Sequence, residues 1–355
     1  MSHQFRELLK KVGSGQHTKK DLTRSEAAIA GRMMLTQEAT PAQIGAFLIA
    51  HRIKRPTGME LAGFLDAYDE LGGKIAPLPD SPRLPLVFGV PYDGRTRTAP
   101  IVPLTALLLA TAGIPVILHG GDSLPTKYGL PLIDIFQALG LDFCPLSLTQ
   151  VHQLLVESSF TFYYMPKHFP LAQGLVTYRD EIGKRPPLAT LELIWSPYGG
   201  ESHLVAGYVH PPTEQMIRVA LQERGEQRYT LVKGLEGSCD LRLSQTTIIA
   251  IHQANTESES AYLKLDPHPY GLAHKEIPLE QTADYFQSLE QVLEGQLTNL
   301  AKAVIWNSAF YLWHYGVCEN LKSAIAQAEF LLTSGQVNQK RQAIHSQLAQ
   351  FKKFP

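Results

Sequence analysis

Two apolar segments, residues 84–90 and 114–118, most constrain the fold of this chain. They read Leu-Pro-Leu-Val-Phe-Gly-Val and Ile-Pro-Val-Ile-Leu, and continuous apolar runs of this length are typical of strands buried on both faces of a sheet. Residues 101–112 between them have the length and composition of a helix. The three segments therefore predict a right-handed crossover between two parallel strands.

Strand and helix patterns continue to alternate along the chain. Further apolar runs that predict strands lie at residues 160–164, 204–208, 229–233 and 246–252, with a helical pattern at 212–223. Residues 281–350 are almost entirely helical in pattern. This alternation predicts an α/β fold with a mostly parallel central sheet flanked by helices.

The first 75 residues have a different pattern, with three helix-start signals at Thr23, Thr40 and Thr57. Each threonine is followed three residues later by Glu or Gln, which is the capping-box arrangement. Apolar residues then recur at helical spacing, so we expect a small bundle of short helices. Three prolines within residues 76–82 end this bundle, because proline interrupts both helices and central strands. The α/β part is expected to begin at residue 84.

Composition excludes several classes of protein. No apolar run approaches the roughly 20 residues that span a bilayer, and the first residues are polar, so we expect no membrane association and a cytoplasmic location. The three cysteines are widely separated, which supports neither a disulfide framework nor a cysteine zinc site. The formal net charge of -1 gives no overall basic field for nucleic acid.

Polar loops follow the first two predicted strands, at residues 89–98 and 119–129. The carboxyl ends of parallel strands lie at one edge of a sheet, where ligands bind in α/β proteins. In the first loop Gly89 and Gly94 permit close backbone approach, Arg95 offers charge, and Thr96 and Thr98 offer hydroxyl groups. These residues could bind phosphate, or the segment could be an ordinary surface loop.

The second loop contains His119-Gly120, Ser123, Lys127 and a Gly two residues later, before a helix that ends near residue 140. This pattern resembles the phosphoribosyl diphosphate (PRPP) loop of the anthranilate phosphoribosyltransferases, a glycosyltransferase family. Residues 167–170 and 181–186 are similar to the family's His-Pro helix and its Leu-Gly-x-Arg-Thr turn. Residues 303–309, 324–328 and 334–335 look like its terminal helices, so the resemblance covers nearly the whole chain.

This resemblance implies an organisation and an activity. The helical domain would comprise residues 1–75, with residues 167–196 returning to it, and the α/β domain would comprise residues 84–166 and 197–355. The protein would transfer 5-phosphoribose from PRPP to an aromatic amine such as anthranilate, as in tryptophan biosynthesis. A homodimer through the N-terminal helices is implied in the same way.

The resemblance also assigns site residues. His119 and Arg185 would be catalytic, with Arg185 matching the family's arginine that faces the acceptor carboxylate. Substrate would contact Gly89, Asp93, Gly94, Arg95, Thr96, Thr98, Gly120, Ser123 and Lys127.

Three segments depart from the family's pattern. Its Gly-Thr-Gly-Gly-Asp signature is matched at Gly89, Asp93 and Gly94, whereas Val-Pro-Tyr stands at residues 90–92. Leu118 replaces the family's lysine before the histidine, and Gly121-Asp122 replaces its Asn-Arg.

A magnesium cofactor is implied by the loop after the strand at 229–233. The family carries an adjacent Asp-Glu pair there, and in this chain the acids are Glu236 and Asp240, four residues apart. Carboxylate oxygens are the ligands that Mg²⁺ takes in such sites. Glu236 and Asp240 are therefore the predicted metal ligands.

A second hypothesis is a catalytically altered paralogue that keeps the fold and binds nucleic acid through a basic surface. Its candidate patch comprises residues 51–55, Arg95, Arg97, Lys184 and Arg185. A purely structural interaction module has no positive feature in the sequence.

Overall fold

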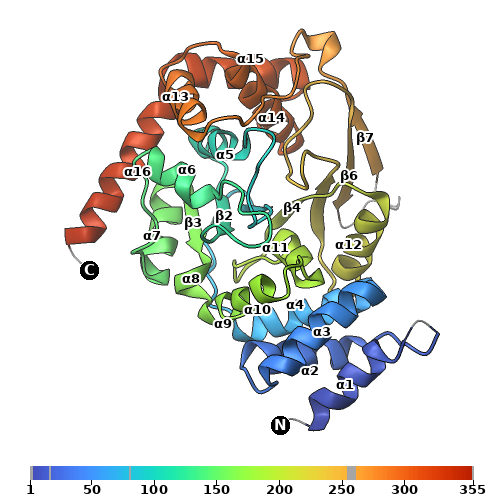
Figure 1. Cartoon of the computed structure of the whole chain (residues 1–355). Coiled ribbons are helices and arrows are strands. Elements are labelled where there is room, and N and C mark those ends of the chain that lie inside the picture. Colours follow the sequence, from blue (N-terminus) through green and yellow to red (C-terminus); the bar gives the residue numbers. More distant parts are fainter. Residues whose placement is uncertain (1–2, 16, 80, 254–260, 354–355) are drawn as a thin grey trace.

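The computed structural model describes residues 3–15, 17–79, 81–253 and 261–353 (Figure 1). Within these residues seven strands form one sheet, in the spatial order β3-β2-β1-β4-β5-β6-β7. Its first five strands are parallel, whereas β6 and β7 are antiparallel to their neighbours. The strands are β1 (Leu86–Gly89), β2 (Val116–Gly120), β3 (Phe160–Tyr164), β4 (His203–Gly207), β5 (Arg228–Val232), β6 (Thr247–Gln253) and β7 (Ala261–Leu265). The predicted α/β fold with a mostly parallel sheet is confirmed. Strand β7 is a further strand that the sequence analysis did not predict.

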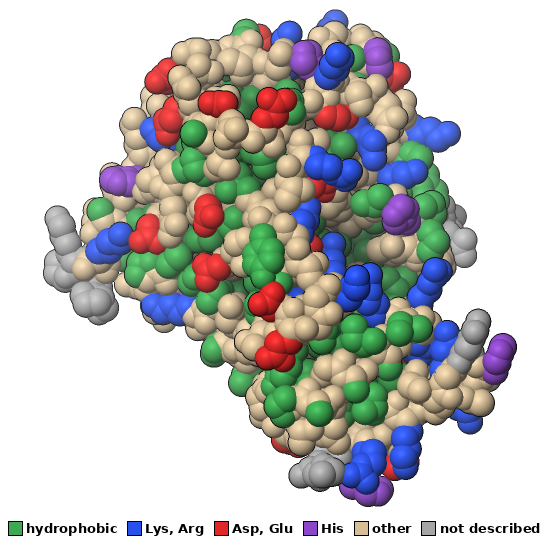
Figure 2. Space-filling model, in the orientation of Figure 1, with side chains coloured by type: hydrophobic (Ala, Val, Ile, Leu, Met, Phe, Trp, Pro, Cys, Tyr) green, Lys and Arg blue, Asp and Glu red, His purple; other side chains and the backbone are tan. Residues whose placement is uncertain are grey.

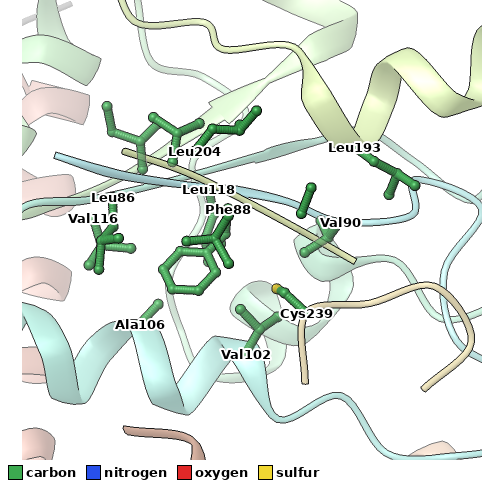
Figure 3. Close-up of a cluster of buried hydrophobic side chains, with 14 of the residues drawn as sticks. Leu86, Phe88, Val90, Val102, Ala106, Val116, Leu118, Leu193, Leu204 and Cys239 are labelled. Carbon is green, nitrogen blue, oxygen red and sulfur yellow. The ribbon is translucent and has the colours of Figure 1, made fainter. Parts of the chain in front are cut away.

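The two apolar segments form the centre of the sheet. Every residue of β1 and β2 is buried, and the strands pair in parallel through Leu86↔Val116 and Phe88↔Leu118. Phe88 points towards α5 (Val102–Thr111), and Leu204 lies on the opposite side of the strands (Figure 3). Both faces of the sheet are therefore covered, as continuous apolar strands require.

Helices α1 (His3–Gly13), α2 (Arg24–Leu35), α3 (Pro41–Lys54) and α4 (Gly58–Leu71) form a bundle at the N-terminal end (Figure 1). The three predicted capping boxes are confirmed: Thr23, Thr40 and Thr57 each accept a hydrogen bond from the third amide of the helix they precede. Helix α4 also packs on α12 (Pro211–Glu223), which connects β4 to β5.

After β3 the chain leaves the sheet before it returns at β4. This excursion contains α8 (Met165–His168), α9 (Pro170–Gln173), α10 (Val176–Glu181), the 3₁₀ helix η1 (Pro187–Thr190) and α11 (Leu191–Ile194). Helix α10 and η1 contact α3, while α11 contacts α4 as well as β1 and β4. On these contacts we propose that the excursion and the N-terminal helices form one discontinuous domain.

The remaining helices lie around the sheet. They are α6 (Leu132–Ala138), α7 (Leu148–Ser158), the 3₁₀ helix η2 (His268–Tyr270), α13 (Thr282–Leu293), α14 (Asn299–His314), α15 (Leu321–Thr333) and α16 (Gln336–Lys353). Helix α14 packs on α5 and on α15. Helices α13 to α16 confirm the helical pattern predicted for residues 281–350. In the described part of the chain, no helix has both the length and the apolar composition to cross a membrane.

Candidate functional site

Backbone hydrogen bonds join the loops that follow β1 and β2. The Arg95 amide donates to the Leu130 carbonyl at 3.2 Å, and the Leu130 amide donates to the Arg95 carbonyl at 2.8 Å. Gly94 has a φ of +72°, and a Cβ atom there would lie 2.4 Å from the carbonyl carbon of Gly129. Since glycine alone permits this approach, the two loops form one continuous surface at the carboxyl edge of the sheet.

A third loop, which follows β5, places the carboxylate of Glu236 on the loop after β1. The carboxylate accepts hydrogen bonds from the backbone amides of Thr96 (3.3 Å), Arg97 (3.1 Å) and Thr98 (3.0 Å), and from the Thr98 hydroxyl (2.9 Å). The Lys127 ammonium lies 2.8 Å from it. We call this set of groups the anion cradle: the amides of residues 96–98, the Thr98 hydroxyl, Lys127 and Arg95.

The anion cradle keeps Glu236 ionised. The side chain is 4% exposed, and its φ of 52° is a left-handed conformation, which costs a non-glycine residue about 1 kcal/mol. Burial alone would raise the pKa of Glu236, but Lys127, Arg95 and Thr98 hold that pKa well below its ordinary value. The cradle therefore suits a negatively charged group, and here the chain itself supplies one.

Arg95 connects the anion cradle to Asp240. Its Nη1 donates to Asp240 Oδ2 and to the Ser238 hydroxyl, both at 2.7 Å, while its Nε lies 3.4 Å from Glu236. The Ile101 amide donates to the same Asp240 oxygen at 3.2 Å. Arg95 thus forms a buried link between the two acids that the sequence predicted as metal ligands.

Glu236 and Asp240 do not fit a magnesium ion in this arrangement. Mg²⁺ is held by oxygen lone pairs, whereas both oxygens of Glu236 and one of Asp240 already accept from N–H or O–H donors. Arg95 and Lys127 also balance their charge. Across residues 3–15, 17–79, 81–253 and 261–353, no group of three or more His, Cys, Asp or Glu side chains could hold a metal.

An apolar pocket lies between the loops after β1 and β2, the excursion helices and the N-terminal helices, and Tyr92 of the loop that carries the cradle amides lines it. It contains about 670 Å³ of empty space, part of it open to solvent. Aromatic and apolar side chains form most of its wall, and we call it the aromatic pocket; its lining includes Tyr68, Tyr92, Met165, Leu188 and Trp195. Pockets with a lining of this kind bind small organic molecules.

Charged side chains gather at one end of the aromatic pocket. Arg179 and Glu192 line it, and Arg179 Nη1 lies 2.6 Å from Glu192. Asp93 lies 3.3 Å from Arg179 Nη2 and 3.6 Å from Arg185 Nη1. The predicted residues Asp93 and Arg185 are therefore brought together, through contacts that also include Arg179.

Sequence reasoning missed Arg179 and Glu192. The signal for Glu192 was present, because a lone carboxylate interrupts the apolar run Leu-Glu-Leu-Ile-Trp at residues 191–195, and an acid in such a run needs a partner. Arg179 lies among other charged residues on α10, and its local sequence carries no comparable signal.

His119, at the end of β2, is completely buried. Its Nδ1 is hydrogen-bonded to the Tyr92 hydroxyl, and its ring packs against Trp195 with 6.2 Å between centroids. Burial lowers the pKa of His119 to about 3, so the ring is neutral at pH 7. Tyr92 and Trp195, not His119, line the aromatic pocket.

The other predicted site residues serve the loops themselves. Gly89 lies so close to α11 that a Cβ atom would be 1.8 Å from the Leu193 carbonyl oxygen. Ser123 donates to the Gly129 carbonyl at 3.4 Å, within the loop after β2. Gly120 is the last residue of β2.

The basic patch of the nucleic-acid hypothesis is divided between surface and interior. His51, Lys54 and Arg95 are buried, and Lys54 lies 2.8 Å from the buried carboxylate of Glu60. Arg97 is exposed, as are Arg52, Arg55 and Lys184. Figure 2 shows Lys and Arg side chains on the right of the face in view, beside the boundary with the N-terminal helices.

Comparison with known proteins adds to this geometry. Residues 6–72 match the model of the helical bundle domain of a glycosyl transferase family, and residues 94–338 match that of its α/β domain. An anthranilate phosphoribosyltransferase of Laribacter hongkongensis is 27% identical over 315 residues, which is 87% of this chain and 89% of that protein. The one from Rhodopseudomonas palustris strain BisA53 is 26% identical over 93% of this chain and 94% of its own length.

Solved structures share the fold. Anthranilate phosphoribosyltransferase from Thermus thermophilus superimposes with a TM-score of 0.77 at 22% identity, covering 96% of this chain and 99% of that one. The Saccharomyces cerevisiae protein in complex with PRPP and Mg gives 0.79 at 17% identity, covering 98% and 100%.

Proposed function

Because this chain belongs to the glycosyl transferase family with a helical bundle domain and an α/β domain, we propose that it transfers a 5-phosphoribosyl group from PRPP to a small aromatic amine. One observation carries the proposal: the loop after β1 contributes to two sites. Tyr92 lines the aromatic pocket, and the amides of residues 96–98 form the anion cradle. A donor and an acceptor held at these two sites would meet at this loop.

The anion cradle is the proposed seat of the diphosphate. Its three backbone amides, Lys127 and Arg95 are donors of the kind that bind phosphate oxygens. Glu236 occupies the cradle in this conformation, so its carboxylate must leave before a phosphate group of PRPP can enter. The lysine and arginine would then offset the negative charge that grows on the departing diphosphate.

Residues around the aromatic pocket would hold the acceptor. Tyr68, Tyr92 and Trp195 offer flat apolar surfaces for an aromatic ring. The neutral ring of His119 does not line the pocket, but its hydrogen bond to the Tyr92 hydroxyl orients Tyr92. His119 is therefore a positioning residue. Catalysis would then come from holding the two reactants in contact and excluding water.

No step in this proposal passes through a metal ion. The Saccharomyces cerevisiae relative was solved with PRPP and Mg, but while Glu236 occupies the anion cradle, Glu236 and Asp240 do not fit that ion. Donor binding is therefore assigned to the cations and amides of the anion cradle.

The test is to incubate the protein with PRPP and a panel of aromatic amines, and to measure diphosphate release together with the mass of the phosphoribosyl product. Lys127→Ala should lower the rate, whereas Lys352→Ala, which removes an exposed lysine outside both sites, should not. Absence of diphosphate release with every amine, together with no PRPP binding by calorimetry, would overturn the proposal.

A further inference from the structure

The guanidinium group of Arg179 has one edge without hydrogen-bond partners. Its Nη1 donates to Glu192 at 2.6 Å. Nε and Nη2, which form one edge of the planar group, are buried, and within the described residues neither has a hydrogen-bond partner. Asp93 Oδ2 lies 3.3 Å from Nη2, but this contact leaves Nε without an acceptor. Buried polar groups are rarely left unpaired, and an edge of this shape matches the two oxygens of a carboxylate.

This unpaired edge belongs to a residue of the aromatic pocket. Arg179 lines the pocket, and its side chain is only 5% exposed. The amide of Tyr92 donates to Glu192 at 3.2 Å, which places an aromatic wall of the pocket beside the pair of Arg179 and Glu192. An aromatic ring held against that wall would bring a substituent within reach of the arginine.

Arg185, the arginine that the family resemblance assigns to the acceptor carboxylate, is placed differently. It does not line the aromatic pocket, and 37% of its side chain is exposed. Its Nη1 lies 3.6 Å from Asp93, and its Nη2 donates to the Ala189 carbonyl at 3.5 Å. Arg185 therefore faces a carboxylate of the protein, whereas Arg179 keeps an edge for a ligand.

Glu192 can offset the charge of such a ligand. A bound carboxylate would add one negative charge to a group in which two arginines already face Asp93 and Glu192. Burial raises the pKa of Glu192, and the charge of Asp93 adds to this rise, while Arg179 and Arg185 oppose it. A further anion on Arg179 acts in the same direction as Asp93, so it favours uptake of a proton by Glu192.

We propose that Arg179, rather than Arg185, binds the acceptor, and that the acceptor is an aromatic amine that carries a carboxylate. The carboxylate accepts hydrogen bonds from Nε and Nη2, and the ring lies against the aromatic walls of the pocket. Arg179 is then the specificity-determining residue of this pocket. The inference rests on the proposed function for the role of the pocket, but it concerns binding alone.

The test uses two ligands of nearly the same shape, anthranilate and anthranilamide, which differ in a carboxylate against a neutral carboxamide. Calorimetric titration of the whole protein at neutral pH, without PRPP, should give a dissociation constant for anthranilate lower by about tenfold or more. Arg179→Lys keeps the positive charge and removes the planar edge. It should abolish this preference by weakening the binding of anthranilate while leaving that of anthranilamide nearly unchanged.

Arg185→Lys is the matched control, because it makes the same substitution at the arginine outside the pocket. It should keep the wild-type preference. Equal or tighter binding of anthranilamide to the wild-type protein would overturn the inference, and this result needs no variant to fold. Equal weakening of both ligands by Arg179→Lys, or loss of the preference in Arg185→Lys alone, would also overturn it. A correct preference without PRPP-dependent transfer would overturn only the proposed function.

Discussion

The carboxylate of Glu236 accepts a hydrogen bond of 3.0 Å from the backbone amide of Thr98, which is 138 residues away along the chain. The bond joins the loop after β5 to the loop after β1, and it fills the anion cradle with a side chain of the protein. Two of the following predictions concern that contact.

Glu236→Ala should bind inorganic diphosphate about tenfold or more tightly than the wild-type protein, because the cradle loses its internal competitor and keeps its amide and cationic donors. Calorimetry in the absence of magnesium measures this. Glu38→Ala removes an exposed carboxylate of the N-terminal helical part and should change nothing. If Glu236 instead held a metal, Glu236→Ala would reduce magnesium-dependent PRPP binding, and that outcome would contradict the assignment.

Lys127→Ala should weaken PRPP binding by about 1.5 to 3 kcal/mol, the usual contribution of a hydrogen bond to a charged group. The lysine lies 2.8 Å from the anion that now fills the cradle, and its side chain is 25% exposed. Calorimetric titration with PRPP measures the difference, with Lys352→Ala as the control. Unchanged affinity would remove Lys127 from the donor site.

His119→Gln should make the free energy of unfolding less sensitive to acid. Burial, with a smaller effect from Lys74, lowers the pKa of His119 to about 3 from an ordinary value of 6.5. The neutral ring therefore contributes stability that is complete above pH 6.5 and is lost as the pH falls towards 3. In this window the free energy of unfolding of the wild-type protein should fall faster than that of the variant as the pH decreases, by up to about 1.4 kcal/mol per pH unit.

Urea unfolding of both proteins at a series of pH values measures the difference. His203 and His314 also have pKa values lowered by burial, so the comparison between variant and wild type isolates His119. Parallel curves for the two proteins would show that His119 titrates normally in the folded state.

The protein should bind duplex DNA only at low salt, because His51, Lys54 and Arg95 are buried and cannot reach the backbone phosphates of a duplex on the protein surface. Each phosphate contact contributes about 0.9 to the slope of log affinity against log salt, so a shallow slope is expected. Retention at increasing salt measures it, with Arg97→Glu/Lys184→Glu as the reversal of two exposed charges. Tight binding at physiological salt that this reversal abolishes would favour the nucleic-acid hypothesis.

The elements that depend on residues close together in the chain were predicted from the sequence. The capping boxes at Thr23, Thr40 and Thr57 depend on contacts within four residues, and apolar runs report burial directly, as β1 and β2 do. Strand β7 has no such signal, since most of its residues are exposed and it forms by pairing with β6.

The sequence by itself determined the α/β class, the N-terminal helices and the two loops at the carboxyl edge of the sheet, because each depends on residues close together in the chain. Tertiary structure alone decided the contacts of Glu236, which the family resemblance made a metal ligand and whose carboxylate accepts from the amides of residues 96–98. It also decided the pairing of Arg179 with Asp93 and Glu192. A buried charged side chain needs a partner of opposite charge, and here the partners come from segments that are distant in the sequence.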